Sequence, residues 1–131
     1  MKIVVWDNTD GTTEQTITIA SKNFDRIKMF GDTIVVGNTS ETHAYSISTG
    51  NSLTTSLPGG NSLSISNLFV GIGQDLNTPE RIRLYYRYNF AHYLDVENPL
   101  LSNANFGKNI IVNDESIWAT TTAEGRLYLI T

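Results

Sequence analysis

The sequence contains no cysteine, only three prolines and no long run of apolar residues. Without cysteine, neither a disulfide nor a thiolate metal site can hold the fold together. No apolar run reaches the roughly 18 residues of a membrane-spanning helix. The first run ends where Trp6 meets Asp7, so the start lacks the apolar core of a signal peptide. We therefore expect a soluble chain without membrane insertion, whose core depends on noncovalent packing.

Charge is also scarce, since Lys, Arg, Asp and Glu make up only 17% of the 131 residues. The formal net charge of −4 argues against general nucleic-acid binding, because such binding needs an excess of cations to displace phosphate counterions. Hydrophobic residues account for 40% of the chain, which is enough to build the core of one ordinary domain. We expect residues 1–131 to form a single domain.

Good helix formers such as Ala, Lys and Glu are few, whereas Thr, Ser, Asn, Gly, Ile, Val and Tyr are abundant. No segment keeps a helical period over the dozen or so residues that a helix requires. Short apolar segments alternate instead with turn residues such as Asp10-Gly11 and Gly31-Asp32. The sequence therefore predicts an all-β protein with antiparallel meanders of about 12–13 strands.

An internal repeat with a period of about forty residues runs through the chain. Each copy has a strand, a Gly-Asp or Asn-Asp turn, an apolar strand, a polar loop and a strand with a central tyrosine. We match Tyr45, Tyr86 and Tyr128 as these central tyrosines. The repeat-like units span approximately 22–60, 61–101 and 102–131, and residues 1–21 complete a terminal unit.

Residues 31–50, GDTIVVGNTSETHAYSISTG, resemble blades of the FG-GAP and quinoprotein-like β-propellers. Residues 105–130, NFGKNIIVNDESIWATTTAEGRLYLI, share their Phe-Gly, Asn-Asp turn and Gly-x-Leu-Tyr ending. The resemblance implies a propeller-like fold with about three blades. Since propellers typically have four to eight blades, we expect self-association, most economically as a dimer. The alternative is an ordinary β-sandwich in which the repeat is an accident of strand spacing.

Few residues have the chemistry of a catalytic or metal site. His43 and His92 are the candidate bases, and both lie on apolar or aromatic strands, which is typical of packed or surface histidines. Asp75, Asn77 and Glu80 offer oxygen ligands, but a calcium loop needs more ligands and a central glycine. The short Asp-containing turns likewise lack the alternating Asp residues of an FG-GAP calcium loop. We therefore expect no enzyme, no metal and no cofactor.

The most chemically loaded segment is 81–95, RIRLYYRYNFAHYLD. At a period of two residues, one face carries Ile82, Leu84, Tyr86 and Tyr88, and the other carries Arg81, Arg83, Tyr85 and Arg87. Arg and Tyr are enriched at binding hot spots, so we predict that the second, outward face contacts a partner. The alternative is an outer strand whose arginines deter unwanted pairing or meet acidic neighbours across the sheet.

These observations favour a non-enzymatic structural or interaction protein that assembles with itself or docks on a larger assembly. Richness in Asn, Ser and Thr, short turns and the lack of cysteine are similar to accessory virion proteins of tailed phages, either head-decorating or tail-associated. This likeness implies localisation in the virion. The alternative function is an oligomeric propeller lectin that binds glycan between blades, although the aromatic positions differ between copies. Trp118, for example, corresponds to Val35 or Phe69.

Overall fold

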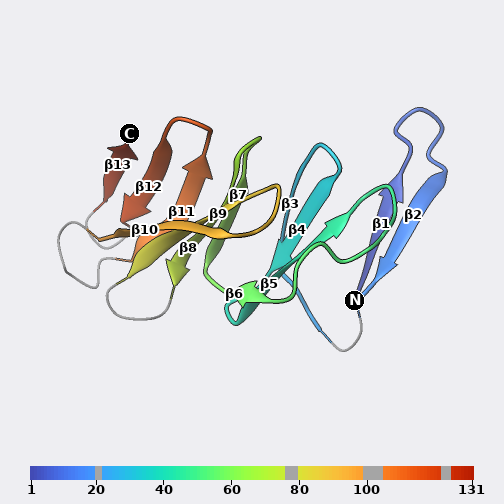
Figure 1. Ribbon diagram of the computed structural model, residues 1–131, viewed down its shortest axis with the longest axis horizontal. Helices are drawn as coiled ribbons and strands as arrows, with labels where there is room; N and C mark the ends of the chain where they lie inside the picture. The colour runs from blue at the N-terminus through green and yellow to red at the C-terminus, as the bar shows by residue number, and fades with distance from the viewer. Residues whose placement is uncertain (20–21, 76–79, 99–104, 122–124) are drawn as a thin grey trace.

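The computed structural model describes residues 1–19, 22–75, 80–98, 105–121 and 125–131. Thirteen strands lie in these ranges, and they form four antiparallel sheets. The sheets stand side by side in a row, with the two termini toward opposite ends of it (Figure 1). No helix among the described residues is long and apolar enough to cross a membrane. The prediction of an all-β fold built from antiparallel meanders is confirmed.

Each sheet is formed by strands that follow one another in the sequence. The N-terminal hairpin pairs β1 (Lys2–Trp6) with β2 (Thr13–Thr18). The first four-stranded sheet contains β3 (Arg26–Phe30), β4 (Thr33–Gly37), β5 (Glu41–Ser46) and β6 (Leu57–Pro58). The second four-stranded sheet contains β7 (Ser62–Ile65), β8 (Phe69–Asp75), β9 (Arg81–Tyr86) and β10 (His92–Glu97). The C-terminal sheet contains β11 (Phe106–Val112), β12 (Ile117–Thr121) and β13 (Arg126–Ile130).

Local turn chemistry explains why the N-terminal hairpin forms. The Asp7 N–H donates to the Thr12 carbonyl over 2.9 Å, and the Gly11 N–H donates to the Asp7 carbonyl over 2.9 Å. Gly11 has a φ of 73°, a left-handed conformation that glycine adopts without steric cost. The Asp10 carboxylate closes the turn by accepting the Thr12 N–H at 2.8 Å. The turn predicted at Asp10-Gly11 is therefore present.

Three apolar clusters lie between successive sheets. Between the N-terminal hairpin and the first four-stranded sheet are Ile3, Ile17, Ile19, Ile34, Val36 and Tyr45. Between the two four-stranded sheets are Val35, Ala44, Leu57, Leu63, Val70, Ile72, Tyr85 and Phe90. Between the second four-stranded sheet and the C-terminal sheet are Ile82, Leu84, Phe106, Ile110, Val112, Ile117 and Ala119. Because alternate residues of a strand point to opposite faces, the middle sheets contribute to two clusters and are covered on both sides.

Glycines bring the second four-stranded sheet close to the C-terminal sheet. A Cβ atom on Gly71 would lie 2.5 Å from Val112 Cγ2, and one on Gly73 would lie 2.3 Å from the Gly107 carbonyl oxygen. Two hydrogen bonds join β7 of the second four-stranded sheet to β11. The Ser62 hydroxyl donates to the Gly107 carbonyl over 2.5 Å, and the Val112 N–H donates to Ser64 Oγ over 2.9 Å. The first strands β3, β7 and β11 consequently lie next to one another.

The last strand of the first four-stranded sheet is short. β6 is only Leu57–Pro58, and an isolated bridge pairs Ser52 with Tyr45. Pro58 cannot donate to a ladder, so it fits only this edge position. In the second sheet, Phe90 belongs to the turn before β10, with a φ of 58°.

Candidate functional site

Arg81 and Arg83 on β9 converge on one carboxylate of the neighbouring strand β10. Arg81 Nη1 lies 3.0 Å from Asp95 Oδ2, and Arg83 Nε lies 3.9 Å from Asp95 Oδ1. His92 Nε2 lies 2.9 Å from the same Oδ1 atom. Burial raises the pKa of Asp95, but hydrogen bonds from His92 and Arg81 outweigh it and hold that pKa below its ordinary value. The two arginines thus meet an acidic neighbour within their own sheet.

Arg87 connects the two four-stranded sheets. Its Nη1 donates to Thr33 Oγ1 at 3.2 Å, and its Nε donates to the Asn67 carbonyl at 2.7 Å. The guanidinium also lies 5.2 Å from the centre of the Phe30 ring, within the range of a cation–π interaction. Because Thr33 and Phe30 belong to the first sheet, Arg87 acts as a tie between sheets.

Tyr85 lies in the core, so its predicted outward orientation was wrong. It belongs to the cluster between the two four-stranded sheets. The strand register pairs Tyr85 with Val70. At the same place in the first sheet it pairs Tyr45 with Ile34. The counterpart of Tyr45 is therefore Tyr85 and not Tyr86, and the sequence alignment of the repeats was displaced here by one residue.

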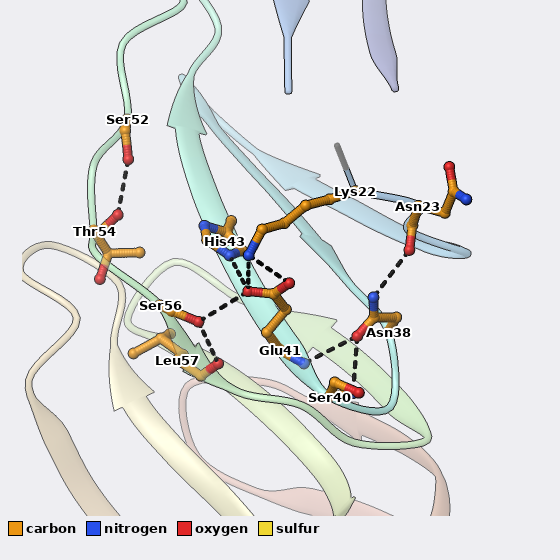
Figure 2. A network of polar contacts seen from close by, with 10 residues as sticks. All are labelled: Lys22, Asn23, Asn38, Ser40, Glu41, His43, Ser52, Thr54, Ser56 and Leu57. Carbon is orange, nitrogen blue, oxygen red and sulfur yellow. Dashed lines mark hydrogen bonds and ion pairs between the residues drawn. The ribbon is translucent and has the colours of Figure 1, made fainter. Parts of the chain in front are cut away.

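A polar network of the first sheet surrounds Glu41 on β5 (Figure 2). Lys22 Nζ donates to Glu41 Oε1 at 2.6 Å, His43 Nε2 lies 2.8 Å from Oε2, and the Ser56 hydroxyl lies 3.4 Å from Oε2. Hydrogen bonds from His43 and Lys22 lower the pKa of Glu41 from 4.5 to about 2. The carboxylate therefore stays ionised throughout the physiological range.

The network around Glu41 has side chains found in hydrolases but not their arrangement. A nucleophilic serine must contact the base that takes its proton. Here Ser56 contacts the carboxylate of Glu41, which stands between the hydroxyl and the imidazole of His43 (Figure 2). The contacts instead fix the segment before β6 and the segment before β3 onto β5.

Of the three oxygen-bearing residues that were weighed as cation ligands, Asp75 and Glu80 lie in different contacts. Asp75 pairs with Arg81 in the β8–β9 ladder, and the Glu80 carboxylate accepts the Phe106 N–H at 2.8 Å. Asn77 lies outside the described residues. Across the described ranges, no group of three or more His, Asp and Glu side chains is close enough to hold a metal ion.

An apolar row is exposed on the outer face of the C-terminal sheet. The register places Ile111 opposite Trp118 and Trp118 opposite Leu129, so their side chains form one row across the three strands. Their exposed fractions are 65%, 38% and 51%, although Ile117 and Ala119 on the other face are buried. We call Ile111, Trp118 and Leu129 the C-terminal row.

A second apolar patch is exposed on the first four-stranded sheet, on its face toward the N-terminal hairpin. Ile27 and Met29 on β3 are 52% and 66% exposed. They pair with Val36 and Ile34, so they share the face on which the N-terminal hairpin packs. The hairpin covers Val36 and Ile34 but leaves the two β3 residues uncovered. We call Ile27 and Met29 the N-terminal patch.

Sequence reasoning selected the arginine strand and missed both apolar ends. A usable signal was present in the runs Ile110-Ile111-Val112 and Ile117-Trp118-Ala119. Both phases of these strands are apolar, which is typical of strands that are covered on two sides. In this chain only one of the two sides is covered.

No protein-family model matches the sequence, and no curated protein matches it. Solved structures do match. The computationally designed Ika4 protein aligns with a TM-score of 0.75 and 14% identity over 98% of this chain and 78% of its own. The computationally designed Ika8 protein aligns with a TM-score of 0.73 and 16% identity over 98% of this chain and 39% of its own.

BamB from Moraxella catarrhalis aligns with a TM-score of 0.64 and 17% identity. The alignment covers 98% of this chain and 42% of BamB, so the chain spans about two fifths of the length of BamB and of Ika8. At these identities the likeness shows the fold alone. It confirms the expected propeller-like arrangement over the alternative of a β-sandwich.

Proposed function

We propose that this protein is a structural interaction module that associates end to end with copies of itself. The observation that carries the proposal is the exposure of apolar side chains on two outward-facing surfaces of the row of sheets, the C-terminal row and, beside the N-terminal hairpin, the N-terminal patch. Contiguous exposed apolar residues of this kind mark interaction sites. The predicted docking on a larger assembly, with a tailed-phage virion as its setting, belongs to the same proposal.

The C-terminal row of one copy can cover the N-terminal patch of another. In the hairpin, β1 and β2 cover only the part of the first four-stranded sheet that contains β4 and β5. The N-terminal patch on β3 therefore lacks a covering strand. The C-terminal sheet of a second copy can bring β11 and β12 to this place, so that Ile111 and Trp118 pack on Ile27 and Met29. The contact is heterologous, because different surfaces of the two copies meet.

The arginine strand is a weaker candidate for this contact. Arg81 and Arg83 are tied to Asp95, Arg87 is tied to Thr33, and Tyr85 is buried. Partner binding by these four residues stays a prediction. Their intramolecular contacts make the apolar ends the better-supported surfaces for assembly.

Sedimentation and light scattering of the 131-residue chain test the proposal. We expect a concentration-dependent oligomer, with Trp118→Glu and Met29→Glu each greatly weakening it, because a charge would be buried at the junction. Tyr88→Glu is the matched control, since Tyr88 is an exposed aromatic in the turn after β9. This change should leave the oligomer intact.

A mixing experiment separates a heterologous contact from general stickiness. A Trp118→Glu copy keeps its N-terminal patch, and a Met29→Glu copy keeps its C-terminal row. An equimolar mixture should therefore form a dimer with one native junction. A monomeric native chain at its highest soluble concentration, or variants that assemble as well as the native chain, would contradict the proposal.

A further inference from the structure

A groove runs between the second four-stranded sheet and the C-terminal sheet. Its volume is about 220 Å³, which suits a small ligand better than a drug-sized one. Apolar side chains of β9, β10, β12 and β13 line much of it, namely Leu84, Leu94, Val96, Ile117 and Ile130. Aromatic rings and carboxylates complete the lining at the end where β11 turns into β12.

The aromatic side of the groove is a supported stack. Phe69 and Tyr93 line the groove, and their rings stack with centroids 5.1 Å apart. Tyr86 packs against both, at 5.7 Å from Phe69 and 4.9 Å from Tyr93. Tyr93 is nevertheless 45% exposed. The stack therefore holds an aromatic ring in place and leaves part of it open to a ligand.

The opposite rim carries negative charge. Asp114 and Glu115, in the turn between β11 and β12, both line the groove. The Leu68 N–H donates to Asp114 Oδ1 at 2.9 Å. This hydrogen bond is the main cause that lowers the pKa of Asp114, and the positive charge of Arg87 lowers it further. Asp114 is therefore ionised at neutral pH, and Glu115 is solvent-exposed.

From this groove we propose a binding site for a small alkylammonium cation. The face of a tyrosine ring is the negative end of its quadrupole and attracts cations, and weakly hydrated quaternary ammonium groups are recognised in this way. The carboxylates add attraction of the same sign, and the apolar floor accepts the methyl groups. The net charge of −4 also favours a cation over an anion. The site does not depend on self-association.

Titration with choline, followed by the NMR shifts of the aromatic side chains, tests the site. The decisive control is the uncharged analogue in which a tert-butyl group replaces the trimethylammonium group. It has the same shape without the charge, so we expect it to bind roughly fivefold to thirtyfold more weakly. Binding of choline should also weaken as salt concentration rises.

Three variants localise the binding. Tyr93→Leu should abolish it, and Glu115→Gln should weaken it severalfold. Trp6→Leu removes another exposed aromatic, on β1, and should leave binding unchanged. Circular dichroism melting checks that Tyr93→Leu still folds. If Tyr93→Leu does not fold, Glu115→Gln still tests the site, because Glu115 is exposed and its substitution should not disturb the fold. Equal binding of choline and its uncharged analogue, or binding of methyl glycosides in place of choline, would overturn the proposal.

Discussion

Leu63 and Ile27 occupy the same place in two successive sheets, yet one is 5% exposed and the other 52%. Leu63 pairs with Ile72 on the neighbouring strand, and Ile27 pairs with Val36. Both face the preceding sheet in the row. The difference is the neighbour, because β3 stands in front of Leu63, whereas the N-terminal hairpin has no strand in front of Ile27.

The comparison shows that burial in this protein is decided between sheets and not within them. The same residue type at the same ladder position is core in one sheet and surface in the next. The C-terminal row provides the same contrast at the other end, since Trp118 is exposed and the β8 residues that face the C-terminal sheet are covered. Substitutions at matched positions can therefore measure what a neighbouring sheet contributes.

The largest effect is expected from Leu63→Ala. Truncation of a fully buried leucine leaves a cavity and costs about 2–5 kcal/mol of unfolding free energy. The matched change Ile27→Ala should cost less than about 0.5 kcal/mol, as is usual for surface positions. Urea unfolding gives both values. The measurement is made in a Trp118→Glu background so that assembly does not contribute, and equal losses at the two positions would refute the comparison.

Gly73→Ala tests the close approach between covered sheets. The new Cβ would lie 2.3 Å from the Gly107 carbonyl oxygen, so backbone must move, at a cost of about 1–3 kcal/mol or more. Gly11→Ala is the control in the N-terminal hairpin. A Cβ added at Gly11 would meet no atom within 4 Å. Only the positive φ of 73° makes alanine unfavourable there, at a cost of about 1 kcal/mol. Thermal unfolding should rank Gly73→Ala as the more destabilising, and the reverse order would show that the sheets are not held this closely.

Arg87→Met measures how much the polar contacts of Arg87 contribute to the unfolding free energy where two sheets already share an apolar core. The change removes the hydrogen bonds to Thr33 and Asn67 but keeps an unbranched side chain over Phe30. We expect a loss of about 1 kcal/mol. Lys28→Met, at an exposed cation of β3, should change the unfolding free energy much less. Equal values for the two variants would mean that Arg87 does not tie the sheets together.

The smallest effect concerns the Glu41 network and depends on pH. The pKa of Glu41 is about 2 in the folded protein against an ordinary 4.5, so the folded state prefers the ionised carboxylate. Its stabilisation is complete above pH 4.5 and is lost as the pH falls toward 2. Because the network is partly exposed, we expect no more than about 1 kcal/mol. Glu41→Gln should flatten unfolding free energy against pH in this window, whereas Glu97→Gln, an exposed change on β10, should preserve the slope.

The sequence was sufficient for most of the fold because strand and turn signals are local. Alternation at Ile17 and the glycines at positions 11 and 31 indicate strands and turns directly. The interior role of Tyr85 could not be predicted. The residue does lie on the strand face opposite Ile82 and Leu84, as the alternation indicates, but only the neighbouring sheet decides that this second face is covered as well. The exposure of the C-terminal row and the N-terminal patch could not be predicted either. A strand with two apolar faces predicts that both faces are covered, whether or not a neighbouring sheet is present to cover them.

The glycines of β8 also bear on geometry beyond one junction. At Gly71 and Gly73 the facing strand β11 approaches without an intervening side chain. Toward β10 the gap between the sheets is instead filled by Tyr93, Leu94 and Val96. Two sheets that touch closely along one margin and are held apart along the other form a wedge. A repeated wedge turns a row into an arc, so the glycines that allow tight contact also help to set the number of blades in a complete circle.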